Sequence, residues 1–110
     1  MEKINVYICV NDYKISTVGT ISDDIISCCK DFLRIDYDIN NKMLIKEDSL
    51  SKIVINFEKC EMNVSLKDYD GFFINNIVLK SYSYDNNKIE IEYILIDSDD
   101  KIYYEVEYEV

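Results

Sequence analysis

Apolar side chains occupy every second position along two segments near the end of the chain, residues 88–96 and 102–110. A period of two is typical of β-strands, because successive side chains of a strand point to opposite faces of the sheet. We therefore expect two strands here. The apolar set consists of Ile89, Ile91, Tyr93, Leu95, Ile102, Tyr104, Val106, Tyr108 and Val110.

These two strands are predicted to form an antiparallel hairpin whose loop lies around Ser98 and Asp99. Directly opposed residues share a face, so the loop must contain an even number of residues if both apolar sets are to stay together. With a loop of two or four residues, carboxylates oppose one another on the reverse face. The pairs are Glu92–Glu105 and Glu90–Glu107 for the shorter loop, and Glu92–Glu107 and Glu90–Glu109 for the longer one.

The preceding segment continues the alternation through a predicted two-residue turn at Asn86 and Asn87, a pair that tolerates left-handed conformations. This turn sets Tyr84 against Ile89, Tyr82 against Ile91 and Val78 against Leu95. Lys80 falls on the otherwise apolar face, which the pattern leaves unexplained unless the side chain reaches out at an edge. The far end of the reverse face is predicted to be apolar, with Ile77, Leu79, Ile94, Ile96 and Tyr103.

The first half of the chain predicts a hairpin and a helix. Alternation on both sides of Asn11-Asp12 predicts a hairpin that pairs Val10 with Tyr13 and Ile8 with Ile15. Residues 23–34 are predicted to form one short helix, with Ser22 as its N-cap, because Ile25, Ile26, Cys29, Phe32 and Leu33 recur at helical spacing. Its apolar stripe needs a sheet to cover, and the predicted apolar end of the reverse face is a candidate.

The middle of the chain predicts two further hairpins and a turn. A three-residue loop at residues 40–42 would set Ile39 against Met43 and Tyr37 against Ile45, and a four-residue loop would pair Ile53, Ile55 and Phe57 with Leu66, Val64 and Met62. A turn is expected at Asp68–Gly71. The predicted fold class is therefore α+β: an antiparallel meander of hairpins with one helix packed on the sheet, in a single domain spanning residues 1–110.

The composition is that of a folded and strongly acidic protein. Hydrophobic residues make up 48% of the 110 positions, and the net charge is −10. Nine of the acids and only two lysines lie in residues 85–110, so most of the excess charge falls on the C-terminal sheet. Such a field repels nucleic acid and anionic lipid and attracts basic partners. The same face has a simpler interpretation as a solvated surface kept soluble by its charge.

The cysteines and the N-terminal segment predict a reduced, cytoplasmic protein. Cys9, Cys28, Cys29 and Cys60 show no C-x-x-C spacing, and the start of the chain has no apolar run of signal-peptide length. We expect the cysteines to be small buried hydrophobes without a disulfide or zinc.

The residues that most enzymes and metal sites use are missing. The chain has no histidine, which excludes Ser-His-Asp and Cys-His arrangements and imidazole metal ligands. Asp97, Asp99 and Asp100 resemble the opening of a calcium loop, but Ile102 and Tyr108 stand where its glycine and closing glutamate belong. We expect no cofactor, no metal and no enzymatic activity. A carboxylate-based enzyme or ion-binding domain is the least favoured alternative.

The leading hypothesis from the sequence is a small intracellular protein that masks a basic surface on a protein partner. Inhibitors, immunity proteins against nuclease-type toxins, and anti-defence proteins that mimic nucleic acid all act in this way. Nucleic acid and membranes are not expected as partners. The second hypothesis is a structural or accessory domain of a bacterial or phage assembly that self-associates, and a homodimer is compatible with either. The expected partner-binding residues are Glu90, Glu92, Tyr103, Glu105, Glu107 and Glu109.

Overall fold

The computed structural model describes residues 1–68 and 72–110, and these residues form ten β-strands and no helix. All neighbouring strands are antiparallel, and the sheet closes into a barrel because β1 pairs with both β2 and β10. No helical segment of the described chain has the length and apolar character to cross a membrane. The strands are β1 (Glu2–Val10), β2 (Tyr13–Ser22), β3 (Ile25–Lys30), β4 (Leu33–Asp38), β5 (Met43–Glu47), β6 (Ser51–Asn56), β7 (Glu61–Leu66), β8 (Phe72–Asp85), β9 (Lys88–Leu95) and β10 (Lys101–Glu109).

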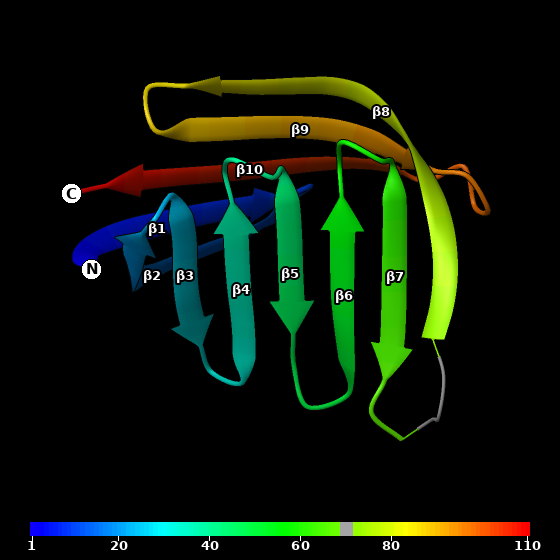
Figure 1. The fold of residues 1–110 in the computed structure, drawn as a ribbon, viewed down its shortest axis with the longest axis horizontal. Coiled ribbons are helices and arrows are strands. Elements are labelled where there is room, and N and C mark those ends of the chain that lie inside the picture. The colour runs from blue at the N-terminus through cyan, green and yellow to red at the C-terminus, as the bar shows by residue number, and fades with distance from the viewer. Residues whose placement is uncertain (69–71) are drawn as a thin grey trace.

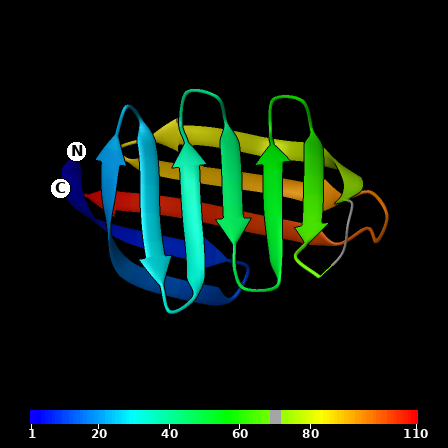
Figure 2. The same ribbon diagram turned by 60° about the horizontal axis from the view of Figure 1, so that its bottom comes forward.

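The barrel is flattened into two layers whose strands run crosswise (Figures 1 and 2). One layer contains β3 to β7, and the other contains β1, β9, β10 and parts of β2 and β8. The long strand β8 joins the layers, since residues 72–76 pair with β7 while residues 77–85 pair with β9. At the other corner, β2 pairs with β1 along most of its length but with β3 only from Gly19 onward.

Gly19 allows the second corner to close. A Cβ atom at this position would lie 2.4 Å from the backbone oxygen of Ser27 and 3.0 Å from Val6 Cγ2. No side chain fits into that space, so the close approach of β2 to β3 requires glycine.

The core lies between the layers and is built from inward-facing residues at alternate positions of the strands. Phe57 lies within it, with its ring centroid 5.6 Å from that of Tyr93. The buried set consists of Ile4, Val6, Ile8, Ile15, Ile26, Cys28, Ile35, Tyr37, Leu44, Ile55, Phe57, Met62, Ile77, Ile89, Ile91, Tyr93, Tyr104, Val106 and Tyr108.

The predicted helix over residues 23–34 is wrong, and with it the α+β fold class and the N-cap at Ser22. Asp23 and Asp24 have φ angles of 52° and 61° and form the two-residue turn between β2 and β3. Positive φ at both central residues is the type I′ geometry that matches the twist of a hairpin. The helical spacing was misleading because Phe32, counted in the apolar stripe, is 88% exposed in the turn between β3 and β4.

The first predicted hairpin is confirmed. Val10 pairs with Tyr13 and Ile8 with Ile15 around Asn11-Asp12, as the alternation predicted.

The predicted register of β8 with β9 is confirmed near the turn of the hairpin and is wrong at positions farther from the turn. Tyr84 opposes Ile89, as predicted, but Val78 opposes Ile94 and not Leu95. A register shift between Leu79 and Ser81, a β-bulge, separates the two regions and explains Lys80. Because the bulge adds a residue, the side chain of Lys80 points outward and is exposed to solvent.

The two middle hairpins form with different registers. Tyr37 opposes Leu44, so the predicted pairing of Tyr37 with Ile45 is wrong by one residue and Leu44 enters the core. Between β6 and β7 the predicted pairs are wrong by two residues: Ile55 opposes Met62 and not Val64. A shift of two keeps the same residues on the inner face. The predicted turn at Asp68–Gly71 includes residues outside the described part of the chain.

Candidate functional site

All six predicted partner-binding residues lie on the outer face of β9 and β10. Their neighbours in sequence, such as Ile91 and Val106, are buried, so the alternation of the strands turns the site residues toward solvent. Glu105 directly opposes Glu90, and Tyr103 directly opposes Glu92. Glu107 and Glu109 continue along β10, opposite Tyr7 and Asn5 of β1.

The predicted ladder of opposed carboxylates is largely wrong. The hairpin keeps the parity that the alternation required, but Ile94 opposes Lys101, so the register differs from both of the predicted ones. In this register Glu90 and Glu105 are the one directly opposed acidic pair of the described β9–β10 ladder. Glu107 opposes Lys88.

Lys88 holds the remaining acidic pair together. Its Nζ atom lies 3.2 Å from Glu90 Oε1 and 3.0 Å from Glu105 Oε1. The hydrogen bond to Glu105, followed by the one to Glu90, raises the pKa of Lys88 above its ordinary value. Replacing Glu90 or Glu105 with glutamine would remove the repulsion between the two carboxylates, but it would also remove a favourable contact with Lys88.

The rest of the acidic face is a mixture of engaged and open carboxylates. Lys101 Nζ lies 2.5 Å from Glu92 Oε1, and the Tyr103 hydroxyl donates a hydrogen bond of 3.1 Å to Glu105 Oε2. Desolvation and this bond both raise the pKa of Tyr103. Within the described chain, no salt bridge involves Glu107 or Glu109. These two carboxylates are therefore open to a cationic partner.

A hollow of about 540 Å³ opens on the same face, between the end of β8 and β10. Its floor is low because Ser83, opposite Glu90, has a small side chain. The hollow is lined by Ser83, Asp85, Asn86, Lys88, Glu90 and Glu107.

An exposed apolar patch lies at the other end of this face and consists of Ile74, Val78, Ile94 and Ile96. Val78 directly opposes Ile94, and the backbone N–H of Ile96 donates to Asn76 O, between Ile74 and Val78 in sequence. Ile74, Val78 and Ile96 are 60%, 42% and 49% exposed. No described element covers the patch.

The sequence predicted this patch in part. Ile94 and Ile96 lie on the outer face as expected. Tyr103 lies beside them, because it follows Lys101 on the outer face of β10 and Lys101 opposes Ile94. Ile77 is buried in the core and Leu79 packs against it, so assigning them to the outer face was wrong. The bulge exchanges them for Val78 and Ile74, which the prediction missed. The unexplained Lys80 was the signal of this exchange.

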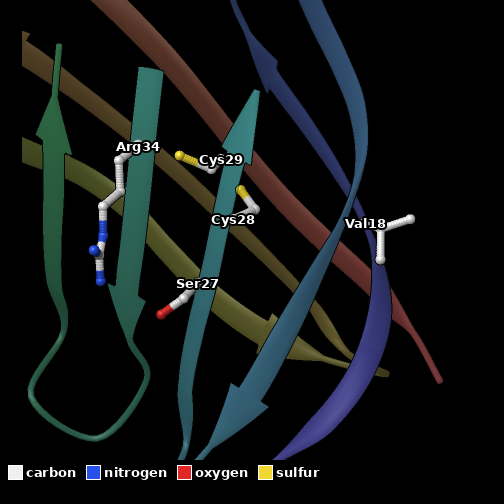
Figure 3. A pocket seen from close by; sticks show the side chains of 5 residues that line it. All are labelled: Val18, Ser27, Cys28, Cys29 and Arg34. Carbon is white, nitrogen blue, oxygen red and sulfur yellow. The ribbon is translucent and has the colours of Figure 1, made fainter. Parts of the chain in front are cut away.

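A second hollow, of about 220 Å³, lies where β2 turns away from β3. Figure 3 shows Ser27, Cys28 and Cys29 along β3, with Arg34 on β4 and Val18 on β2. Arg34 Nε is already engaged by Asp36 Oδ2 at 3.0 Å. Burial raises the pKa of Cys28 to about 11, so this thiol stays protonated at neutral pH. The hollow therefore offers no activated thiolate from Cys28, and the Asp36 carboxylate already engages one nitrogen of Arg34.

The four cysteines are free thiols. Cys28 is buried as predicted, but Cys29 is exposed, which corrects the expectation that all four are buried. Its position explains the difference: alternation along β3 turns Cys28 inward and Cys29 outward.

Residues 1–68 and 72–110 contain no group of three or more cysteine, aspartate or glutamate side chains placed to hold a metal ion. The loop between β9 and β10, predicted around Ser98 and Asp99, is closed by its own backbone, since Asp99 N–H donates to Leu95 O at 2.8 Å. No protein-family model, curated protein or solved structure matches the chain significantly.

Proposed function

We propose that this protein binds and masks a basic surface on a protein partner, using the outer face of β8, β9 and β10. One observation carries the proposal: this face combines an uncovered apolar patch with five of the chain's glutamates. Protein interfaces typically combine apolar with polar surface.

The apolar patch supports binding to a protein over binding to a small ion. Ile74, Val78 and Ile96 are each more than two-fifths exposed, and the Ile96 N–H donates to Asn76 O between the other two, although a surface that faces water gains nothing from a group of aliphatic side chains. Tyr103, between the patch and Glu105, is of a residue type that is enriched in interfaces.

The charge of the face supports a basic partner. Glu107 and Glu109 form no salt bridge within the described chain, and the net charge of −10 adds a long-range attraction for positive surfaces. Lys88 and Lys101 neutralise part of the negative field, so the attraction for a basic partner is concentrated at the carboxylates without a salt bridge. An inhibitor or immunity protein for a nuclease-type toxin, or an anti-defence protein that occupies a nucleic-acid-binding surface, would use such a face.

The proposal is tested by capture of partners from an extract of the cells that express the protein, with four immobilised variants beside the parent. The patch variant carries Val78→Ser and Ile96→Ser, and its control carries Phe32→Ser, an equally apolar residue that is 88% exposed in the β3–β4 turn. The acid variant carries Glu92→Gln, Glu105→Gln and Glu107→Gln. Its control carries Asp31→Asn, Glu58→Gln and Glu61→Gln, which remove the same charge elsewhere.

The expected result is a basic protein that the parent and both controls retain and that the patch and acid variants lose. Its complex, once reconstituted from purified components, should weaken as salt is raised. A partner that all five proteins retain equally, or a partner with an acidic surface, would refute the proposal.

Self-association remains the second candidate function, and the uncovered patch is the observation that favours it. The charge opposes it, because two copies would each bring a net charge of −10. Light scattering of the purified chain at low and high salt decides the matter: an oligomer that persists at both salt concentrations supports assembly, and a monomer at both counts against it.

A further inference from the structure

Among residues 1–68 and 72–110, no strand pairs with the second half of β8 on the side away from β9. Residues 77–85 pair with β9 on one side, while β7 pairs only with residues 72–76. Figures 1 and 2 show this half of β8 as the outermost strand of its layer. Half of the backbone N–H and C=O groups of an edge strand point away from its partner, so this edge can accept another strand.

The regular part of the edge is short and defined at both ends. The bulge between Leu79 and Ser81 interrupts it on one side, with Lys80 exposed there, and the Asn86-Asn87 turn ends it on the other. Bulges and lysines protect edges against unwanted pairing. Residues Ser81–Asp85 remain, and they are long enough for a short strand.

The surroundings of Ser81–Asp85 select a particular kind of strand. On the outer face, Ser81 and Ser83 are small and lie directly beside Glu92 and Glu90. The side chains of an added strand would lie two strand spacings from these glutamates, about 10 Å, a gap that a lysine and a glutamate span together. The 540 Å³ hollow over Ser83 provides the space.

On the inner side, an added strand would meet aromatic residues. Tyr84 is 44% exposed, and its hydroxyl lies 3.2 Å from that of Tyr108. Apolar side chains on alternate positions of the incoming strand would pack there, while basic ones would face the glutamates.

We infer that β8 accepts an extended segment of the partner as an additional strand, with basic residues at alternate positions that lie across Ser81 and Ser83 toward Glu90 and Glu92. This inference rests on the proposed function and adds the mode of binding. A second copy of the chain fits the edge less well, since it would bring its own acidic face beside that of the first.

The test uses peptides of alternating lysine and valine as probes, titrated into the full chain by calorimetry. Two isomers carry N-methyl groups on one or the other alternating set of backbone nitrogens. Only one set can donate to β8 in an added strand, so one isomer should bind about tenfold more weakly while the other binds like the parent peptide. Amide signals of residues 81–85 should shift and gain protection from hydrogen exchange on binding.

Matched variants of the protein locate the site. Ser83→Lys places a long side chain and one positive charge in the hollow, whereas Ser16→Lys adds the same charge on the exposed outer face of β2, away from the hollow. The first should abolish the difference between the two N-methylated isomers and the second should leave it intact.

Three outcomes would overturn the inference. Equal binding of both isomers means that charge alone attracts the peptides, which leaves the proposed masking function standing. A dimer of the chain alone that Ser83→Lys disrupts means that a second copy occupies the edge. Failure of every cationic peptide to bind at low salt would refute the basic partner as well.

Discussion

The two layers of the barrel carry different charge patterns on their outer faces. Across β4, β5 and β6 the signs alternate, because Arg34 opposes Glu47, which in turn opposes Lys52. Across β9 and β10 two glutamates, Glu90 and Glu105, oppose each other. Opposite charges across a ladder stabilise a sheet and like charges destabilise it.

The difference indicates that the two faces serve different purposes. The β3–β7 face can be explained by stability and solubility alone. The β8–β10 face keeps an unfavourable pair that needs Lys88 as a bridge, and it leaves an apolar patch uncovered. Binding to a partner is the purpose that accounts for both features together, and the following experiments test how far the layers differ.

The largest effect on stability is expected at high pH, because the layers share a core with buried tyrosine and cysteine side chains whose pKa values are raised. Burial raises the pKa of Tyr93 to about 12 and that of Cys28 to about 11, and it also raises the pKa of Tyr104. Raised pKa values mean that the folded protein holds these protons more tightly. Their contribution is complete below the unfolded values, about 10 for tyrosine and 8.5 for cysteine, and is lost as pH rises through the folded values.

The barrel should therefore unfold in alkali in one transition. Circular dichroism and tyrosinate absorbance measure this transition. Two separate transitions would show that the layers are independent units and would contradict the common core.

The next largest effect is expected at the corner that joins the layers. Gly19→Ala places a Cβ atom 2.4 Å from Ser27 O and should lower the free energy of unfolding by about 2 to 3 kcal/mol, as overpacking does. Urea denaturation measures the change, and Thr20→Ala at the neighbouring, half-buried position is the control. Equal stability of the Gly19 variant and the parent would mean that β2 and β3 can separate at no cost.

The tyrosine hydroxyl groups on the inner faces of the two layers differ in their hydrogen bonding. The Tyr37 hydroxyl of one layer is hydrogen-bonded to that of Tyr82, while the buried Tyr104 hydroxyl of the other has no hydrogen-bond partner among the described residues. Tyr104→Phe should raise the free energy of unfolding by about 1 kcal/mol, and Tyr37→Phe should lower it by a similar amount. Denaturant midpoints of the two variants on opposite sides of the parent would confirm the contrast. A destabilised Tyr104→Phe variant would reveal a partner for that hydroxyl.

The smallest effects concern the outer charges themselves. Glu47→Gln removes an acid with opposed cations on both sides, and a bridge to Lys67 of 3.2 Å, and should cost up to about 1 kcal/mol. Glu105→Gln removes the bridge to Lys88 together with the repulsion from Glu90, so its effect should stay within about 0.5 kcal/mol. Thermal unfolding of both variants at one pH gives the comparison. If Glu105→Gln cost more than Glu47→Gln, the acidic face would serve stability after all.

Local patterns in the sequence were sufficient to predict strand pairing close to the turns of two hairpins. Asn11-Asp12 and Asn86-Asn87 are short turns between alternating segments, so the registers of β1 with β2 and of the end of β8 with β9 follow from parity alone. Parity also placed all six predicted site residues on one outward face. The apolar patch was only half predicted, because a single added residue at Lys80 reverses the faces of everything before it.

Other features depended on contacts between residues far apart in the chain. Residues 25–33 fit a helical stripe and a pair of short strands equally well in isolation, since short apolar runs carry no decisive period. Pairing of β3 with both β2 and β4 selected the strands. The sequence by itself determined which side chains share a face within each hairpin, because side-chain alternation is a local property of a strand. Only the tertiary structure decided that β1 meets β10, that β8 bends from one layer to the other, and that Lys88 stands between two glutamates, because these depend on how the whole sheet closes around its core.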